Sequence, residues 1–523
     1  MKKRVYQWHR RLSLIIAVPV LLWAASGFMH PIMTNIRPDV VTQGLTAVPV
    51  DSSKIRVPLQ TALLKNHIDS FVRCRLVHID SNWFYQVQKE QGKEPVYMGT
   101  LNGKILAAGD WLYAQYLARE FLEGEAPRSA APIAGGTFHD CCDDATASVL
   151  NTPKGSRVSD AAFITTYTSE YKSINRLLPV YKVSFERADG IRIYVETIQD
   201  RFAFAMDDKR RIFDRIFTLV HTWGWLEFLG KGKLAIEFLL AFTAFCTALL
   251  GICIFFMTNG KKVNGKVATP GGRELVKARR NHRYVSIAVA LFTLMFSFSG
   301  SFHALYKFKE DIRDRYWASP RFASSGFDFN FRQLQEIVKA PVFNIGLVGI
   351  EGRGYWQINT AAAATSVRRD LMKDAQSATP DAVYVSVDDH RILPQGELKY
   401  ARFLAARFSG RQEAEILSSS VITRFTNEYN FTDKRLPVWK ISYATNGNER
   451  WYVETSSGKL SRSINDRDLV EGYSFAFFHK HEFMAWGGKG LKDLSTMFWA
   501  LAQVAMVTVG LILWWRIRRR RSL

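Results

Sequence analysis

The chain has 523 residues, of which 47% are hydrophobic, and it carries a formal net charge of +22 at pH 7. Such a length exceeds one ordinary domain and suggests several structural units. The positive charge does not indicate a nucleic-acid-binding protein, because much of it borders long apolar segments, as in the cytoplasmic flanks of membrane helices. The basic clusters lie at residues 2–11, 261–283 and 516–521.

Four segments are long and apolar enough to cross a bilayer, which takes roughly 20 helical residues. They lie at about residues 12–34, 234–257, 284–307 and 494–515. We interpret the first as a retained helix and not a cleaved signal peptide, because it shows no clear small-residue cleavage site. The basic flanks predict that both termini are cytoplasmic and that the two large polar segments lie outside.

These features predict a division of the chain into seven parts. In order, they are a first transmembrane helix (1–34), a first outer α+β domain with an interfacial helix (35–233), a second transmembrane helix (234–257), a basic cytoplasmic loop (258–283), a third transmembrane helix (284–307), a second outer α+β domain (308–493), and a fourth transmembrane helix with a basic tail (494–523).

The two halves of the chain are related by an internal repeat. Residues 176–197 match residues 434–455 at an offset of 258, and the apolar segments 9–30 and 282–303 match at an offset of 273. Because the landmarks keep their order, each half is expected to form helix, outer domain, helix. The predicted fold is therefore a membrane four-helix bundle of two pseudo-repeats with two outer α+β domains.

Within each outer domain the sequence predicts a β-hairpin, because residues 180–185 and 191–196 alternate in polarity around Ala188-Asp189-Gly190. Residues 446–448 form the corresponding turn of the second half. Residues 111–121 and 211–221 have the apolar spacing of helices. The second of these helices is expected to lie on the membrane surface. The Gly-Lys-Gly triplets at 230–232 and 488–490 are expected to be bends at the entry to membrane helices.

Six of the eleven histidines form three repeat-related pairs, each at a predicted membrane boundary. The pairs are His9/His282, His30/His303 and His221/His479. Neutral imidazole is a good axial ligand for haem iron, and helices of a bundle can hold a haem between two histidines. A single interfacial histidine is usually only a polar surface residue, but repetition of all three positions favours ligands. The constellation therefore predicts that the protein binds at least one haem.

The spacing along each membrane segment places these ligands at opposite membrane faces. His9 and His30 are 21 residues apart, which corresponds to ~31 Å along a helix. We therefore expect His9 and His282 to hold an inner haem. The outer ligands stay open: His30 with His303, His221 with His479, or cross pairs such as His30 with His221. Gly27 and Gly300 are expected to make room for a flat macrocycle.

A second candidate metal site consists of His139, Cys141 and Cys142, a mixture of ligands that can bind a metal. The spacing fits no standard zinc pattern. A disulfide between Cys74 and Cys141 or Cys142 is the alternative.

Sequence motifs for other chemistry are missing. The chain contains no dinucleotide-binding glycine pattern, no Walker sequence and no nucleophile elbow. We therefore expect electrons to come from quinol or from a separate cytoplasmic donor.

The chain resembles the bacterial PepSY-associated transmembrane proteins, often described as iron-regulated inner-membrane proteins. The resemblance rests on Trp-His-Arg-Arg-Leu-Ser at 8–13, the Leu-Pro-Val-Tyr-Lys-Val and Tyr-Val-Glu-Thr hairpin, the segments around His221 and His479, and the basic tail. Members of this family are similar to the ferrioxamine siderophore reductase, an inner-membrane protein with two b-type haems. The resemblance implies periplasmic outer domains and an oxidoreductase that passes electrons to a periplasmic ferric siderophore and releases Fe(II).

Two other classes of function compete with this interpretation. In one, the outer domains act as non-catalytic PepSY peptidase-inhibitor or sensor modules and the histidines are structural. In the other, the protein transports haem or a metal, although within the predicted spans only Glu237 is acidic or basic near mid-membrane.

Overall fold

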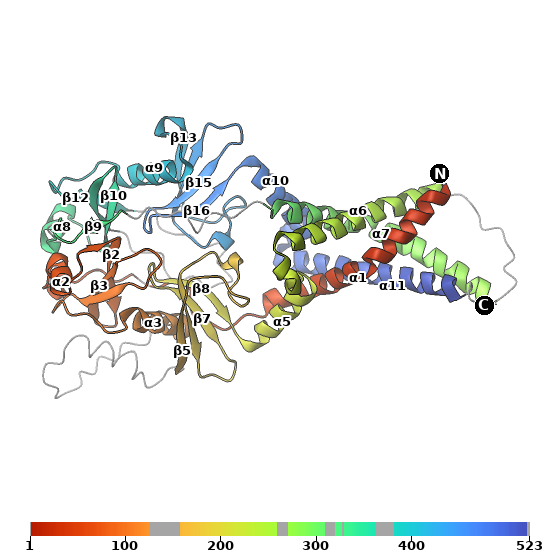
Figure 1. Cartoon of the computed structure of the whole chain (residues 1–523), viewed down its shortest axis with the longest axis horizontal. Helices are drawn as coiled ribbons and strands as arrows, with labels where there is room; N and C mark the ends of the chain where they lie inside the picture. The colour runs from red at the N-terminus through yellow and green to blue at the C-terminus, as the bar shows by residue number, and fades with distance from the viewer. Residues whose placement is uncertain are drawn as a thin grey trace. The chain divides into compact units, whose positions relative to one another are not determined.

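The computed structural model describes residues 2–45, 47–124, 157–258, 270–308, 320–326, 329–360 and 381–519. The chain forms two compact units, drawn in Figure 1. The helical unit comprises Met1–Arg37, Lys209–Glu310 and Arg467–Leu523, and the outer unit comprises Pro38–Asp208 and Asp311–Asp466.

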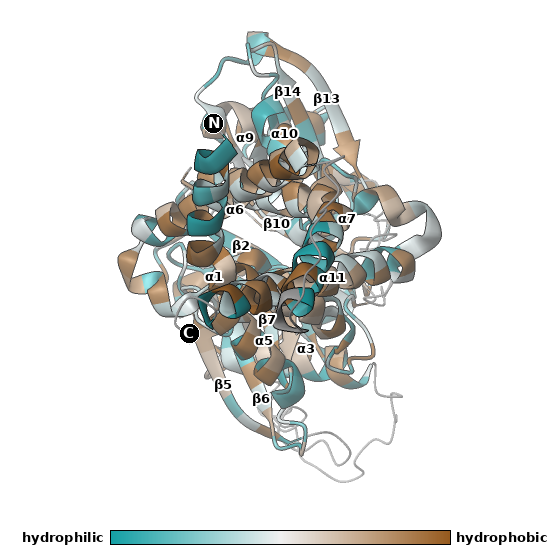
Figure 2. Ribbon diagram, turned by 90° about the vertical axis from the view of Figure 1, so that its right-hand side faces the viewer, coloured by the Kyte–Doolittle hydropathy of each residue, from teal (hydrophilic) through white to brown (hydrophobic). Residues whose placement is uncertain are grey.

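Four long helices build the helical unit: α1 (Lys2–Asn35), α6 (Lys231–Thr258), α7 (Pro270–Tyr306) and α11 (Gly488–Arg519). Each is long and apolar enough to cross a membrane, which confirms the four predicted spans in this respect. Figure 2 shows the apolar residues along them. Helices α1 and α7 each pack against both α6 and α11, so the equivalent helices of the two halves lie at opposite corners of the bundle.

Short helices precede the second span of each half. They are α5 (Asp208–Val220) and η3 (Gly224–Leu229) before α6, and α10 (Asp466–Ser474), η8 (Phe475–His479) and η9 (Glu482–Gly487) before α11. The predicted helix at 211–221 is therefore confirmed, while its position at a membrane surface stays a prediction. Gly230 and Gly488 adopt positive φ angles of 53° and 78° where the chain turns into the spans, as the Gly-Lys-Gly triplets predict.

A six-stranded antiparallel sheet joins the two halves of the outer unit. Its strand order is β12 (Ala382–Ser386), β11 (Arg353–Asn359), β10 (Asn344–Ile350), β2 (Arg73–Ile79), β3 (Asn82–Gln88) and β4 (Val96–Gly99). Strand β10 of the second half pairs with β2 of the first, with Gly346 opposite Arg75. A small sheet of β1 (Ser70–Phe71) and β9 (Phe322–Ala323) joins the halves again.

Each half also has its own four-stranded sheet. One contains β5 (Val158–Ile164), β6 (Val180–Phe185), β7 (Arg192–Glu196) and β8 (Arg201–Met206); the other contains β13 (Ile416–Ile422), β14 (Val438–Tyr443), β15 (Arg450–Glu454) and β16 (Lys459–Ile464). Helices α3 (Gly109–Glu123) and α9 (Gly396–Ser409) pack against them. The other helices among the described residues are α2 (Leu59–Lys65), α8 (Phe331–Val338), η1 (Ser52–Lys54), η2 (Ser173–Asn175), η6 (Glu413–Glu415) and η7 (Phe431–Asp433).

The predicted hairpins and the helix at 111–121 are confirmed by β6–β7, β14–β15 and α3. The two outer segments, which the sequence led us to expect as two domains, fold as one compact unit because they share the six-stranded sheet. The PepSY character of this unit stays a prediction.

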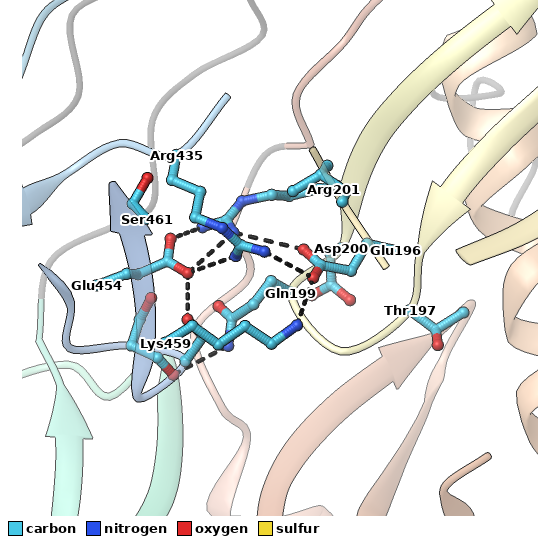
Figure 3. A network of polar contacts seen from close by, with 12 residues as sticks. Glu196, Thr197, Gln199, Asp200, Arg201, Arg435, Glu454, Lys459 and Ser461 are labelled. Carbon is cyan, nitrogen blue, oxygen red and sulfur yellow. Dashed lines mark hydrogen bonds and ion pairs between the residues drawn. The ribbon is translucent and has the colours of Figure 1, made fainter. Parts of the chain in front are cut away.

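Buried charges from both halves meet inside the outer unit (Figure 3). The carboxylates of Glu196 and Glu454, which are repeat-related, are fully buried. Arg435 donates to Glu454 at 2.7 Å and to Glu196 at 3.4 Å, and Lys459 Nζ donates to Glu196 at 3.1 Å. Arg201 binds both carboxylates. The neighbouring cations hold the pKa values of both glutamates below their usual range despite the opposing effect of burial.

We expect Glu196→Ala to destabilise the outer unit by about 3–5 kcal/mol, because it leaves buried cations without their partner. The measurement is urea unfolding of the purified protein, followed by tryptophan fluorescence. The control is Glu186→Ala, which removes only a surface pair whose Glu186 side chain is 51% exposed. Equal midpoints for the two variants would contradict this role of the network.

Each half of the outer unit also has an acidic residue in the first turn of a helix. These residues are the buried Asp110 in α3 and the partly buried Glu397 in α9. Tyr97 donates to Asp110 at 2.7 Å, and Tyr384 donates to Glu397 at 2.7 Å. Burial raises the pKa of Asp110 to about 7, whereas the pKa of an unfolded aspartate is about 3.9. The folded state therefore binds a proton that the unfolded state has lost, and this contribution to stability disappears as the pH rises from about 4 to about 7.

Asp110→Asn should remove this contribution. We expect the free energy of unfolding of the variant to fall less steeply with pH across that window than the free energy of the parent protein. Urea titrations at a series of pH values measure this slope, and parallel slopes would show that Asp110 is not protonated in the folded state.

Candidate functional site

The histidines that end the two equivalent short helices face each other in the helical unit. His221 follows α5, and His479 ends η8. The centroids of their rings are 6.4 Å apart, and the ring planes are inclined by 76°. Two imidazoles that bind one metal from opposite sides, with metal–nitrogen bonds of ~2 Å, have a similar separation. The structure therefore brings the rings of two candidate ligands to a separation that suits coordination of one metal ion.

A serine from a long helix holds each of these rings. Ser26 Oγ of α1 lies 2.9 Å from His221 Nδ1, and Ser299 Oγ of α7 lies 3.1 Å from His479 Nδ1. Ser26 also donates its one hydroxyl proton to the carbonyl of Leu22 at 2.6 Å. Its oxygen is then the acceptor, and His221 Nδ1 carries the proton. This tautomer leaves a lone pair on Nε2, as a metal ligand requires.

Phenylalanines one turn earlier stack on both rings. Phe217 lies parallel to His221 with centroids 4.5 Å apart, and Phe475 lies parallel to His479 with centroids 4.6 Å apart. Stacking and the serine hydrogen bond together restrict rotation of each imidazole. The same contacts occur in both halves, so the fold fixes the orientation of both rings.

His30 and His303 lie beside the same phenylalanines. The His30 ring is 5.2 Å from Phe217, and the His303 ring is 4.5 Å from Phe475. His303 Nδ1 is bound to the carboxylate of Glu471, whereas no described residue makes a hydrogen bond to the His30 ring. Within the described part of the chain, His30 and His303 do not contact each other as His221 and His479 do.

The inner histidines pack against glycines of the neighbouring helices. His9 Nδ1 donates to the carbonyl of Thr247 at 3.2 Å, so its Nε2 also carries the lone pair. A Cβ added at Gly251 would lie 3.4 Å from the His9 ring, and one added at Gly510 would lie 3.1 Å from the His282 ring. In each half, therefore, a glycine of a neighbouring membrane helix lets the helix approach the inner histidine closely.

Ser286 is the hydrogen-bond partner of the His282 ring, with its hydroxyl 3.4 Å from Nδ1. A cavity with about 1020 Å³ of empty space, counting the part open to solvent, is lined by Arg4, Val5, Trp8, Leu12 and Leu250. Neither His9 nor His282 is among its lining residues, so it does not bear on the inner histidines.

At the outer level the side chains present fit haem, because the rings of His221 and His479 approach each other. Among the described residues, the structure shows no ring contact between His9 and His282. His9, His221 and His479 have Nδ1 engaged by the protein and Nε2 available. A Cβ at Gly300 would meet nothing within 4 Å, and one at Gly27 would meet only Ala500 at 3.9 Å. Packing between protein groups therefore does not explain these two glycines, whereas the predicted macrocycle would.

One buried histidine was not predicted as a site residue. His481 is fully buried and has a φ of 51°, and Ser495 Oγ lies 3.0 Å from its Nδ1. Its Nε2 has no partner among the residues that the structure describes. The repeat equivalent is Trp223, which stacks on Trp23 at 5.1 Å. The substitution of histidine for tryptophan in the repeat is the sequence signal that marks this position.

The other predicted metal site lies outside the described residues, since these include neither His139 nor Cys141 nor Cys142. Cys74 is buried in β2, and its predicted disulfide stays untested. In the described ranges, no group of three or more His, Cys, Asp or Glu side chains is arranged to hold a metal ion.

Comparison with known proteins does not assign the chain. A scan against models of protein families found no match, and no curated protein matches the sequence. The functional argument therefore rests on the geometry of the histidines and on the internal repeat.

Gly510→Ala should destabilise the helical unit relative to Gly490→Ala in the same helix α11. Alanine favours a helix over glycine by about 1 kcal/mol, but only at 510 does the new methyl group crowd an imidazole, whereas a Cβ at Gly490 meets nothing within 4 Å. Thermal unfolding of the two detergent-solubilised variants measures the difference. A Gly510→Ala protein at least as stable as Gly490→Ala would contradict the close packing of His282.

Proposed function

We propose that this protein is a b-type haem protein of the bacterial inner membrane that passes electrons across the membrane to a periplasmic ferric siderophore and releases Fe(II). In this proposal His221 and His479 hold the outer haem, and His9 and His282 hold the inner one. Bound haem would supply reversible one-electron chemistry.

The observation that carries the proposal is the approach of His221 and His479, 6.4 Å apart, with both Nδ1 atoms bound to serines. An edge-to-face ring pair contributes only about 0.5–1.5 kcal/mol by itself, whereas a shared ligand would use both rings. Serine hydroxyls at Nδ1 fix the tautomer and the ring direction, which is how proteins prepare histidine for a metal.

The helices set the distance between the two levels. His9 and Ser26, the partner of His221, lie on the same helix α1 and are separated by ~25 Å at 1.5 Å per residue. The inner and outer ligand pairs therefore lie near opposite ends of the bundle. The pairing of His221 with His479 is supported over His30 with His303, because only the former pair is in contact among the described residues.

The proposed electron acceptor and the proposed orientation in the membrane rest on observations other than the histidine geometry. The ferric siderophore rests on the family resemblance, and the periplasmic side rests on the basic residues that flank the spans. The electron donor is quinol or a cytoplasmic reductant, since the sequence contains no nucleotide-binding motif.

An absorption spectrum of the purified protein, expressed with adequate haem, tests the cofactor. We expect a Soret band, and we expect His221→Ala to lose one of two redox centres in a potentiometric titration. His67→Asn is the matched control, because this exposed histidine has a φ of 53°, which asparagine tolerates. Absence of a Soret band in the parent protein would refute the proposal.

His9→Ala and His282→Ala should each remove the other redox centre and leave the outer one in place. Loss of the same centre in His9→Ala and His221→Ala would contradict two separate levels. Finally, the dithionite-reduced protein should be reoxidised by a ferric siderophore with formation of Fe(II), which a ferrozine assay measures. Reoxidation by none of a panel of hydroxamate, catecholate and carboxylate siderophores would exclude this acceptor.

A further inference from the structure

The two halves of the outer unit differ at one pair of equivalent positions next to the junction of β2 and β10. The sequences of these strands align so that Arg75 corresponds to Gly346. The repeat offset of 258 makes Asp200 correspond to Gly458. The first half therefore has two charged side chains where the second half has two glycines.

In the first half the two charges fill the space between the strands. Arg75 binds Asp200 at 2.8 Å and donates to Gln86 at 2.6 Å and to the carbonyl of Thr197 at 2.7 Å. Tyr113 donates to the Asp200 carboxylate at 2.5 Å. In the first half, this position therefore holds the carboxylate of Asp200, which is bound by a guanidinium and a tyrosine hydroxyl.

The second half has the equivalent glutamine and tyrosine but lacks the two charged side chains. Gln357, equivalent to Gln86, donates to the carbonyl of Thr455 at 3.3 Å, as Gln86 does to Thr197 at 2.9 Å. Tyr400, equivalent to Tyr113, is buried, and no hydrogen bond of its hydroxyl occurs with any described residue. Because glycines replace the two charged residues, space is left between the same neighbours, and a cavity lies next to Gly346 and Gly458.

The cavity contains about 620 Å³ of empty space, counting the part open to solvent. Gly346, Gly458, Gln357, Tyr400 and Arg73 are among its lining residues, and none of the residues that line it is acidic. The amide oxygen of Asn344, which also lines it, is buried without a partner among the described residues. This oxygen is an acceptor, so a hydroxyl group of a ligand could satisfy it, whereas a carboxylate could not.

Two arginines line the cavity, and because Arg75 is paired with Asp200, Arg73 supplies the remaining positive charge. Its guanidinium donates to the carbonyl of Ser457 at 2.7 Å and to the carbonyl of Ser456, so two of its five N–H donors are used by neutral acceptors. Burial lowers the pKa of Arg73 to about 10, which leaves the side chain charged at neutral pH. Unlike Arg75, which binds Asp200, Arg73 has no carboxylate among its hydrogen-bond partners in the described chain.

We propose that this cavity binds a small carboxylate, whose anionic group takes the place that Asp200 occupies in the first half and accepts hydrogen bonds from Arg73 and Tyr400. The first half suggests the ligand class, because there a carboxylate lies between an arginine and a tyrosine. In the second half Tyr400 is the equivalent tyrosine, and Arg73, which is contributed by the first half and is not the repeat equivalent of Arg75, supplies the guanidinium. A cationic ligand is disfavoured by Arg73 and by the absence of acidic lining residues. The site lies within the outer unit and does not depend on the proposed haem.

Equilibrium dialysis of the full-length protein in detergent against radiolabelled acetate, lactate and malonate tests the site. We expect at least one of them to bind with a stoichiometry of one per chain. Tyr400→Phe, which keeps the ring and removes only the hydroxyl, should weaken binding about tenfold, as should Arg73→Gln. Arg391→Gln is the control, because its side chain is 86% exposed, and it should bind as the parent does.

Binding of none of the three carboxylates would overturn the proposal. Equal affinity in the parent and in Tyr400→Phe would also overturn it, and this variant retains the core packing if Arg73→Gln proves unstable. Competition by inorganic phosphate as strong as competition by unlabelled carboxylate would show a general anion site and contradict the carboxylate assignment. The haem spectrum of each variant should stay unchanged, which separates this test from that of the proposed function.

Discussion

The hydrogen bond between an outer histidine and a serine of a long helix is the interaction on which the functional interpretation depends. Ser26 and Ser299 each occupy the Nδ1 side of a ring, and Phe217 and Phe475 stack on its face. These contacts leave His221 and His479 with one possible direction for Nε2. Since the same contacts occur in both halves of the chain, the orientation of the rings is a shared property of the internal repeat.

The same repeat has a second consequence in the outer unit. Glu196 and Glu454 occupy equivalent positions and share cations from both halves, so the buried network needs both halves to be folded (Figure 3). Burial of these charges costs desolvation free energy, and the hydrogen bonds between them restrict the geometry in which the two halves can pack. At the junction of β2 and β10 the halves have diverged, and the cavity beside Arg73 is the result.

Periodicity and composition predicted the elements whose signal is local. The four spans, the hairpins at β6–β7 and β14–β15, and helix α3 follow from apolar spacing and turn residues. Contacts between distant segments were not predictable in this way. The shared sheet depends on pairing across more than 250 residues, and the role of Gly251 becomes visible only when α6 packs against His9. Repetition in the sequence identified His221 and His479 as candidates, but their approach to each other became visible only in the structure.

The central claim is that repeat-related histidines hold haem iron from both sides, and an electron paramagnetic resonance spectrum of the oxidised full-length protein tests it most directly. Two imidazole ligands on one iron predict a low-spin ferric signal, because both axial positions are filled by nitrogen. The account predicts that Ser26→Ala, which removes the hydrogen bond at His221 Nδ1, shifts this signal, while Ser159→Ala in the outer unit leaves it unchanged. A high-spin ferric signal from the parent protein would contradict it.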